Sequence, residues 1–456
     1  MTKKLVILGA GESGIGAAIL GKQKGYDVFV SDFGMISESA KDFFRTASIA
    51  FEEGGHTSAI EDADLVVKSP GIPEKVPAVR SFLEKGTPVI SEIEFGYRFI
   101  NQEKVIAITG TNGKTTTTLL TYHLLKTAGM KVALGGNIGV SFARLVAEGG
   151  YDYYVVEVSS FQLDGIISFK PDVAVLLNIT PDHLDRYDHD FNKYVNSKFR
   201  ITENLTKDEC FIYCSDCAPV NEALAKRKVE ACLFAISASN QENSAAYIDG
   251  KHLIFDLNFG QSGDYHTIPQ AEIALIGRHN MINTMAAVLS GLHFEVSIDR
   301  ILRALKTFKN APHRLEVVDE IGGVKYINDS KATNVDAVAY ALEGIIQPIV
   351  WIAGGTDKGN DYSPIIPIAS QKAKKLICIG VDNASLVAAF ADKLDLTEAV
   401  SMEEAIAIAS EEAAYGDVVL LSPACSSFDR FKNYEHRGDR FKEEVRTLAL
   451  KEKTRV

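Results

Sequence analysis

The stretch from Val105 to Thr116, Val-Ile-Ala-Ile-Thr-Gly-Thr-Asn-Gly-Lys-Thr-Thr, most constrains how this chain can fold. An apolar run of strand length leads into a glycine loop, and a lysine and threonines open a segment with leucines at helical spacing. Glycines let backbone amides turn toward an anion, Lys114 can reach terminal phosphates, and Thr115 or Thr116 can ligate magnesium. The helix N-terminus adds partial positive charge. This order predicts a nucleoside-triphosphate site on a parallel sheet.

The loop is shorter than the usual phosphate-binding pattern, because Ile108 stands where that pattern has its first glycine. A glycine-rich turn with no ligand is the alternative, but Gly-Lys-Thr at the helix start favours a nucleotide. The residues expected to contact ATP here are Gly110, Thr111, Asn112, Gly113, Lys114, Thr115 and Thr116.

Length and charge limit the class of protein. The 456 residues are enough for about three domains with sizeable cores. A net charge of -12 argues against a general nucleic-acid or membrane-surface binder, because both need a basic face. The first apolar run stops at Gly9 with no cleavage pattern after it, and no run has transmembrane length. We therefore expect a cytoplasmic protein with no membrane insertion and no nucleic-acid partner.

Six cysteines raise the question of zinc or redox chemistry, because Cys214 and Cys217 form a C-x-x-C pair close to Cys210. No second pair or histidine cluster at ligand spacing accompanies them. We expect buried or incidental free thiols, which fits a reducing cytoplasm.

The first hundred residues alternate strands and helices around Gly9-Ala-Gly-Glu-Ser-Gly14, with Asp32 just past the second strand. This is the dinucleotide fingerprint, and it motivates a rival hypothesis of a nicotinamide-dependent dehydrogenase. Physically, the loop indicates only that a diphosphate can approach the helix, so a nucleotide-diphosphate sugar would fit as well. The expected strands of this parallel sheet are residues 5–8, 27–31, 65–68 and 88–90.

A second unit begins near Asn101, where the phosphate loop starts another sheet. Its strand from Tyr153 delivers Glu157 at the end, and a carboxylate there suits magnesium beside phosphates. His183 lies in a polar loop and is either a metal ligand or a surface histidine. Lys198 falls on the apolar stripe of the next predicted helix, so it either snorkels to solvent or lies near the active site.

The segment from 205 to 275 reads as short strands and turns, and the helix after it opens with Asn280 and Asn283 on one face. Those amides could address a purine or cap the helix. A third α/β unit starts around Ala311, with strands at 324–327, 349–352, 376–379 and 418–421. Basic and hydroxyl side chains follow these strands, where such sheets bind ligands, and they suit a carboxylate partner.

Several motifs follow one another between Gly9 and Gly438. They are Gly-Thr-Asn-Gly-Lys-Thr-Thr, Glu-Val-Ser-Ser-Phe-Gln-Leu, Asp-His-Leu-Asp-Arg-Tyr, Gly-Arg-His-Asn-Met-Ile-Asn, His-Arg-Leu-Glu, Asn-Asp-Ser-Lys-Ala-Thr-Asn and Ser-Pro-Ala-Cys-Ser-Ser-Phe-Asp. Together they resemble the Mur ligases, and the last two look like the branch that adds D-glutamate. The resemblance covers nearly the whole chain.

The resemblance implies a three-domain α/β fold. A Rossmann-like domain at 1–100 would bind the UDP substrate, a P-loop ATPase-type domain at 101–310 would bind ATP, and a Rossmann-like domain at 311–456 would bind the amino acid and complete the ATP site. It also implies the reaction. The substrates would be UDP-N-acetylmuramoyl-L-alanine and D-glutamate, joined through an acyl phosphate with release of ADP and phosphate, by a monomer that closes around its ligands in peptidoglycan precursor synthesis.

Individual site residues follow from the same resemblance. The expected catalytic residues are Lys114, Glu157, His183 and Lys198. Magnesium is expected at two sites, one on Glu157 with Thr115 or Thr116, the other on His183 and a carbon dioxide adduct, a carbamate, of Lys198. The further ATP contacts are Asn280, Asn283, Arg314 and Asp329. The UDP contacts are Gly11, Glu12, Ser13, Gly14, Asp32, Ser69, Gly71, Asn137 and Ser159. The D-glutamate contacts are His183, Lys331, Thr333, Lys358, Ser427, Phe428 and Tyr434. Two positions depart from the family pattern, because Phe33 replaces a polar residue and Tyr434 replaces a phenylalanine.

Overall fold

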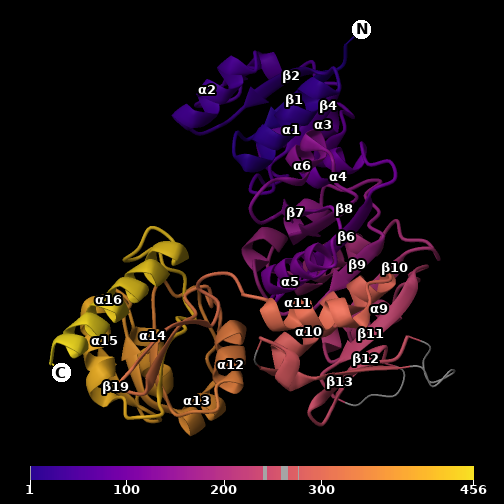
Figure 1. Cartoon of the computed structure of the whole chain (residues 1–456). Coiled ribbons are helices and arrows are strands. Elements are labelled where there is room, and N and C mark those ends of the chain that lie inside the picture. The colour runs from indigo at the N-terminus through magenta and orange to yellow at the C-terminus, as the bar shows by residue number, and fades with distance from the viewer. Residues whose placement is uncertain (1, 240–243, 258–264, 276, 456) are drawn as a thin grey trace. The chain divides into compact units, whose positions relative to one another are not determined.

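A computed structural model describes residues 2–239, 244–257, 265–275 and 277–455 (Figure 1). The chain forms two compact units. The first comprises Met1–Ala274 with Ile282–Phe308, and the second comprises Leu275–Met281 with Lys309–Val456. The first unit holds two β-sheets and the second holds one, so the predicted α/β class with parallel-rich sheets is confirmed.

The first sheet is entirely parallel, in the order β3-β2-β1-β4-β5. Its central strand is buried on both faces, because Leu5 and Ile7 enter one apolar cluster and Val6 and Leu8 another. That is why the strand reads as an uninterrupted apolar run. The elements are β1 (Lys4–Leu8), α1 (Glu12–Gln23), β2 (Asp27–Ser31), α2 (Glu38–Thr46), β3 (Ala50–Glu52), the short helix η1 (Ser58–Ile60), β4 (Leu65–Lys68), α3 (Pro77–Glu84), β5 (Val89–Ser91) and α4 (Glu92–Tyr97).

The second sheet has the order β14-β13-β12-β11-β10-β9-β6-β8-β7, in which β13 pairs antiparallel with both β12 and β14. Four neighbouring parallel strands, β9, β6, β8 and β7, end at one edge, where the phosphate loop lies. The strands are β6 (Lys104–Thr109), β7 (Val132–Gly136), β8 (Tyr153–Glu157), β9 (Val173–Leu176), β10 (Cys210–Cys214), β11 (Cys232–Ser237), β12 (Ala246–Asp249), β13 (His252–Phe255) and β14 (His266–Pro269).

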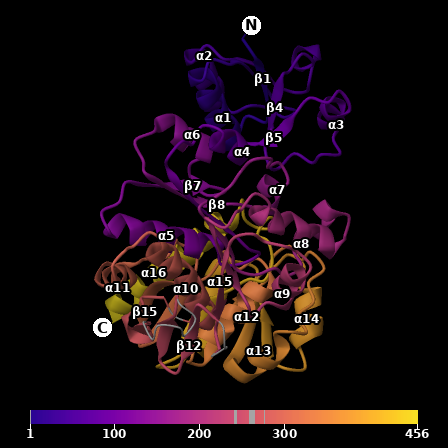
Figure 2. The ribbon, with the colours of Figure 1, turned by 90° about the vertical axis from the view of Figure 1, so that its right-hand side faces the viewer.

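Helix α6 joins the first two sheets, because it packs against α1 and α4 (Figures 1 and 2). Two glycines permit this close approach: a Cβ on Gly16 would lie 1.9 Å from Ser141 Oγ, and one on Gly96 would lie 2.9 Å from Phe142. The helices around the second sheet are α5 (Lys114–Thr127), α6 (Phe142–Glu148), α7 (Ser160–Leu163), η2 (Leu184–Tyr187), α8 (Phe191–Phe199), η3 (Arg200–Thr202), α9 (Ala218–Ala225), η4 (Gln270–Glu272), α10 (Arg278–His293) and α11 (Ile298–Thr307).

The third sheet has the order β15-β16-β20-β17-β18-β19, with only β15 antiparallel among the described strands. Its central strand β20 again alternates between two clusters, with Val418 and Leu420 on one face and Val419 and Leu421 on the other. The elements are β15 (Glu316–Ile321), β16 (Val324–Asn328), α12 (Val335–Gly344), β17 (Ile349–Ala353), α13 (Ile366–Lys372), β18 (Ala373–Cys378), α14 (Ala384–Phe390), β19 (Asp395–Glu398), α15 (Met402–Glu412), β20 (Val418–Leu421) and α16 (Tyr434–Arg455).

The structure adds elements that the sequence did not predict: the strands β3, β15 and β19 and the helices α9 and α13. The predicted domain boundary at 310 lies close to the last break between the units, after Phe308, but the second unit also includes Leu275–Met281, so this boundary stays a prediction. The boundary at 100 falls inside the first unit and stays a prediction. None of the helices in the described ranges is long and apolar enough to span a membrane.

Candidate active site

The phosphate loop connects β6 to α5, and two of its glycines have conformations that side chains rarely adopt. Gly110 has φ 154° and Gly113 has φ 84°, so both peptides can turn their amides into the loop. The end of β9 braces the loop, because Thr111 N donates to Asn178 O at 2.9 Å and Asn112 N donates to the Asn178 side chain at 2.8 Å. The loop is thus held in shape by protein contacts.

Lys114, the first residue of α5, curls back over this loop. Its amine donates to the carbonyl oxygens of Gly110 and Thr111, both at 2.8 Å. A flexible cation on the loop itself is the group that a terminal phosphate needs. At the other side of the loop, a Cβ on Gly113 would lie 2.5 Å from Asn283 Oδ1. The predicted adenine contact Asn283 therefore lies against the loop, and it also accepts from Thr117 Oγ1 at 3.2 Å.

Glu157, at the end of β8, is the carboxylate beside the loop, and only 2% of its surface is exposed. Its Oε2 accepts a hydrogen bond from Thr115 Oγ1 at 2.7 Å, and its Oε1 accepts one from Asn137 Nδ2 at 2.9 Å. The sequence left Thr115 and Thr116 as alternatives, and the hydroxyl of Thr115 contacts Glu157. A carboxylate and a hydroxyl are hard oxygen ligands of the kind that magnesium takes, so the residues fit this ion.

The structure gives no larger ligand set for a metal. In the described part of the chain no three His, Cys, Asp or Glu side chains gather as a metal site. A magnesium ion on Glu157 and Thr115 would therefore need phosphate oxygens or water for its other ligands, as this ion ordinarily does. The six cysteines are free thiols, four of them buried.

Lys198 points into the protein and not to solvent, as the second of its two predicted alternatives, a position near the active site, required. Only 1% of its surface is exposed, and its Nζ donates to Gly110 O at 2.7 Å and lies 4.8 Å from the Tyr194 ring. Burial lowers the pKa of this amine well below its usual value, and the charge of Lys114 lowers it further. The snorkelling alternative is therefore wrong, and Lys198 lies against the phosphate loop.

His183 lies in the loop before η2, in a left-handed backbone conformation with φ 52°. Its ring is 5.3 Å from Phe161, and its Nε2 is 3.6 Å from Asp182 Oδ2. Half of the side chain is exposed. A role of His183 as a metal ligand stays a prediction.

The glycine turn of the first sheet faces the turn after β4. A Cβ on Gly9 would lie 2.5 Å from Ser69 Oγ, and one on Gly14 would lie 1.9 Å from Gly9 O. Asp32 closes one side, because its two carboxylate oxygens accept from Ala10 N and Gly34 N, both at 2.8 Å. In a dinucleotide site this carboxylate would bind ribose hydroxyls. Here it holds the backbone of the turn.

Arg186 braces the opposite turn, which is a contact the sequence did not predict. Its guanidinium donates to three consecutive carbonyl oxygens, those of Pro70, Gly71 and Ile72, at 2.8 to 2.9 Å. The same group lies 4.7 Å from the Phe161 ring. Arg186 therefore ties the predicted UDP turn to the loop that carries His183.

Three other predicted UDP contacts have protein partners of their own. Glu12 accepts from Ser141 N at 3.2 Å, and Ser159 caps α7 with a reciprocal capping box to Gln162. Asn137 donates to Glu157, the predicted magnesium ligand. Ser13 is half-buried on the first turn of α1, and a Cβ on Gly11 would meet open space.

In the second unit, the loops after β16, β17 and β20 carry five of the predicted D-glutamate contacts, while Tyr434 begins α16 and His183 belongs to the first unit. Lys331 Nζ lies 3.6 Å from the centre of the Tyr434 ring, Ser427 is buried, and Phe428 is 72% exposed. An antiparallel bridge between Thr356 and Ser426 joins the loops that carry Lys358 and Ser427. Thr333 lies in the remaining loop, after β16.

The predicted nucleotide contacts of this unit differ in their surroundings. Asp329 Oδ2 accepts from Ser422 Oγ at 3.0 Å and its Oδ1 from Leu315 N at 3.2 Å, while burial raises the pKa of this carboxyl to about 7. Asn280 is buried on the first turn of α10. Arg314 lies between His313 and Leu315, which both have left-handed backbones.

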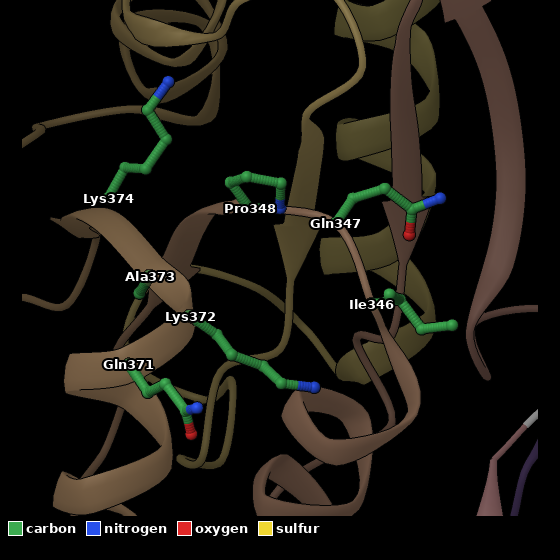
Figure 3. A pocket seen from close by; sticks show the side chains of 7 residues that line it. All are labelled: Ile346, Gln347, Pro348, Gln371, Lys372, Ala373 and Lys374. Atoms are coloured by element: carbon green, nitrogen blue, oxygen red, sulfur yellow. The ribbon is translucent and has the colours of Figure 1, made fainter.

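A hollow in this unit lies away from these residues (Figure 3). It has a volume of about 270 Å³ and lies where β17 and β18 begin, at the sheet edge opposite the predicted site. The amine of Lys372 donates to three backbone carbonyls, those of residues 342, 343 and 345, and so caps the end of α12. Nothing in this hollow points to a ligand.

Comparison with known families accounts for most of the chain. Three sequence profiles match it: the MurD N-terminal domain over residues 4–76, the Mur ligase middle domain over 108–291, and the Mur ligase, glutamate ligase domain over 313–425. The chain belongs to the Mur ligase family. The match over residues 4–76 places the glycine turn in a Mur ligase domain, so the dehydrogenase hypothesis is wrong.

Relatives within the family are similar over their whole length. The UDP-N-acetylmuramoylalanine--D-glutamate ligase of Christiangramia forsetii is 49% identical over 450 residues, covering 98% of this chain and 100% of the relative. The Bacteroides fragilis enzyme of the same name is 47% identical with the same coverage.

Solved structures share the fold at low identity. A MurF ligase from Thermotoga maritima in complex with ADP has a TM-score of 0.62 at 16% identity, covering 92% of this chain and 96% of that one. The UDP-N-acetylmuramate-alanine ligase of the same organism has a TM-score of 0.60 at 17% identity, covering 97% of this chain and 99% of that one.

Proposed function

We propose that this chain is an ATP-dependent ligase that joins D-glutamate to UDP-N-acetylmuramoyl-L-alanine in the cytoplasm, as a step of peptidoglycan precursor synthesis. One observation carries the proposal: relatives with this name are nearly half identical over their full length. The phosphate loop with Lys114, Thr115 and Glu157 is the local chemistry that such a reaction needs.

The reaction has two steps. A carboxylate oxygen of the UDP substrate attacks the γ-phosphorus of ATP, ADP leaves, and an acyl phosphate forms. The amine of D-glutamate then attacks the acyl carbon, phosphate leaves, and an amide results with loss of one proton. Both steps depend mainly on positioning and electrostatics.

Residues of the first unit would serve the phosphoryl transfer. Lys114 would stabilise charge on the transferred group, and the amides of the Gly110–Gly113 loop would hold the phosphates. Glu157 and Thr115 would hold magnesium, which when bound offsets the phosphate charge. Asn283 would contact the adenine from its place beside the loop.

The domains would divide the ligands. Residues 1–100 would hold the UDP part through the turns at Gly9 and Ser69, residues 101–310 would hold ATP, and residues 311–456 would hold D-glutamate through Lys331, Thr333, Lys358 and Ser427. Four positively charged or hydroxyl side chains suit an amino acid with two carboxylates. A monomer would suffice for this reaction.

Lys198 would act as a carbamate. A buried ammonium beside the phosphate loop and a second lysine would repel a metal. A neutral amine can instead attack carbon dioxide, forming a C–N bond and releasing a proton, which reverses the charge and supplies two hard oxygens. With His183, this group would hold the second magnesium ion.

The assay that tests the proposed function follows ADP and phosphate release. Release should require ATP, UDP-N-acetylmuramoyl-L-alanine and D-glutamate together. Turnover of ATP alone at the full rate, or the same rate without D-glutamate, would show that the ligase assignment is wrong.

Lys198→Ala tests the carbamate. The variant should fold, bind nucleotide and lose most activity, and acetate should restore part of it by filling the vacated space. Lys198→Arg, which keeps the positive charge, should stay inactive. An active Lys198→Arg enzyme would contradict the carbamate.

A further inference from the structure

Arg437, on the first turn of α16, is a fully buried cation in the second unit, with 0% of its surface exposed. Its guanidinium donates to Ser330 Oγ at 3.0 Å and Ser330 O at 2.9 Å, to Cys425 O at 3.1 Å, and to Gly354 O at 3.3 Å. These acceptors lie in three separate loops, which follow β16, β20 and β17. One planar group therefore fixes all three loops relative to one another.

Every one of these acceptors is neutral. No carboxylate lies within ion-pair distance of Arg437 among the described residues, although Asp429 acts on it from farther away. Burial lowers the pKa of Arg437 to about 10, so the group still carries its charge at neutral pH. A buried charge without a counter-ion is costly, and it leaves positive potential in the surrounding loops.

The backbone is built to admit this side chain. Gly355 has φ 140°, and a Cβ there would lie 2.2 Å from Ser426 O and 3.1 Å from Arg437 Nη1. Ser330 Oγ also donates to Tyr434 O at 2.8 Å, so the helix start is tied to the same loop.

The three loops are those that would hold D-glutamate, and this inference rests on the proposed function. Lys331 follows Ser330 directly, Lys358 lies four residues beyond Gly354, and Ser427 lies two residues beyond Cys425. We propose that Arg437 is a positioning residue for the acidic amino acid: it gathers the three loops of the pocket, and its uncompensated charge favours an anionic side chain over a neutral one.

Charge and geometry can be separated by substitution in the full chain. Arg437→Gln removes the charge and keeps a polar group of smaller reach. Arg437→Lys keeps the charge but loses the planar fork. Arg440→Gln is the matched control, because Arg440 lies one turn further along α16 and pairs only with Glu443 and Glu444 in the described structure.

The readouts are the KM values of the three substrates and the ratio of kcat/KM for D-glutamate to that for the neutral isostere D-glutamine. For Arg437→Gln we expect the KM of D-glutamate to rise at least tenfold, the KM of ATP to stay within twofold, and the ratio to fall at least tenfold. Arg437→Lys should raise the KM of D-glutamate but keep most of the ratio. Arg440→Gln should change neither.

An unchanged ratio in a folded Arg437→Gln enzyme would overturn the inference, since a scaffold alone would not distinguish acid from amide. If that variant does not fold, Ser330→Ala removes one acceptor and should raise the KM of D-glutamate severalfold without changing that of ATP, and an unchanged value would equally overturn it. A wild-type chain without D-glutamate-dependent turnover would refute the proposed function itself. Failure of the variants on an active wild type refutes this inference alone.

Discussion

Glu92 makes the stability of the first unit depend on pH. This carboxyl lies at the start of α4 with 1% of its surface exposed, and its Oε1 accepts from Ala143 N, in the first turn of α6. Its Oε2 is buried with no hydrogen-bond partner. Burial raises the pKa of Glu92 from 4.5 to about 8, while the Ala143 bond lowers it and the charge of Glu12 raises it further.

The sign and size of the effect follow from this pKa. Between 4.5 and about 8 the folded state binds a proton that the unfolded state has lost, so the free energy of unfolding falls as pH rises through that window. The free energy of unfolding falls by about 1.4 kcal/mol per pH unit while the folded carboxyl stays protonated, and by less near its pKa, where half of it is ionised. The free energy of unfolding therefore falls by about 2 kcal/mol between pH 6 and 8.

Glu92→Gln should remove this loss. The amide has the same shape, keeps a carbonyl oxygen for Ala143 N and does not titrate. In thermal or denaturant unfolding, the wild type should lose about 2 kcal/mol more than the variant between pH 6 and 8. Glu148→Gln, an exposed change on α6, is the control and should behave as wild type. Equal pH slopes for wild type and Glu92→Gln would refute the reasoning.

Three further predictions concern ligand binding. Lys358→Ala should raise the KM of D-glutamate by the equivalent of about 1.5 to 3 kcal/mol and leave that of ATP unchanged, since one charge-assisted hydrogen bond is lost; an unchanged KM of D-glutamate removes the lysine from the pocket. Arg186→Ala frees the carbonyls of residues 70–72 and should raise the KM of the UDP substrate roughly tenfold or more, with partial rescue by added guanidinium ion; no change would mean that the brace does not matter for binding. Asn137→Ala releases Glu157 and should raise the magnesium concentration for half-maximal rate several-fold while the Kd of UDP stays constant; a weaker Kd of UDP would instead support the predicted contact of Asn137 with UDP.

The elements that could be predicted from sequence are those with strong local signals. The strand β20 is apolar throughout and β1 and β6 are apolar after their first lysine up to Leu8 and Ile108, because both faces are covered, and α5 begins at a glycine loop. The strands β3 and β19 were missed because they are short, lie at sheet edges and stay partly exposed, so no apolar run marks them. The antiparallel β15 was missed for a similar reason, since it also lies at a sheet edge and none of its residues is fully buried.

The candidate site divides in the same way. Residues such as Lys114, after a glycine turn, and Glu157, at a strand end, stand in local patterns that indicate their chemistry, so they are predictable before the fold is known. Pairings between distant segments are not. The bonds from Arg186 to residues 70–72 span more than 110 residues, and nothing in the local sequence indicates them.

The sequence left Lys198 between two alternatives and did not single out Arg437, and residue type alone could not settle either position. A lysine on an apolar stripe and an arginine at a helix start usually have solvated charges. Here 1% of the surface of Lys198 and 0% of that of Arg437 is exposed, and only the structure shows this burial. Each donates to backbone carbonyls beside a predicted binding site for an anion, one at the phosphate loop and one among the loops of the third sheet. The two differ in chemistry, because a lysine can lose its proton and take up carbon dioxide, whereas a guanidinium stays charged. Carbamate formation can therefore reverse the charge at Lys198, whereas Arg437 keeps its positive charge. This difference matches the metal site proposed for the first unit and the dicarboxylate site proposed for the second.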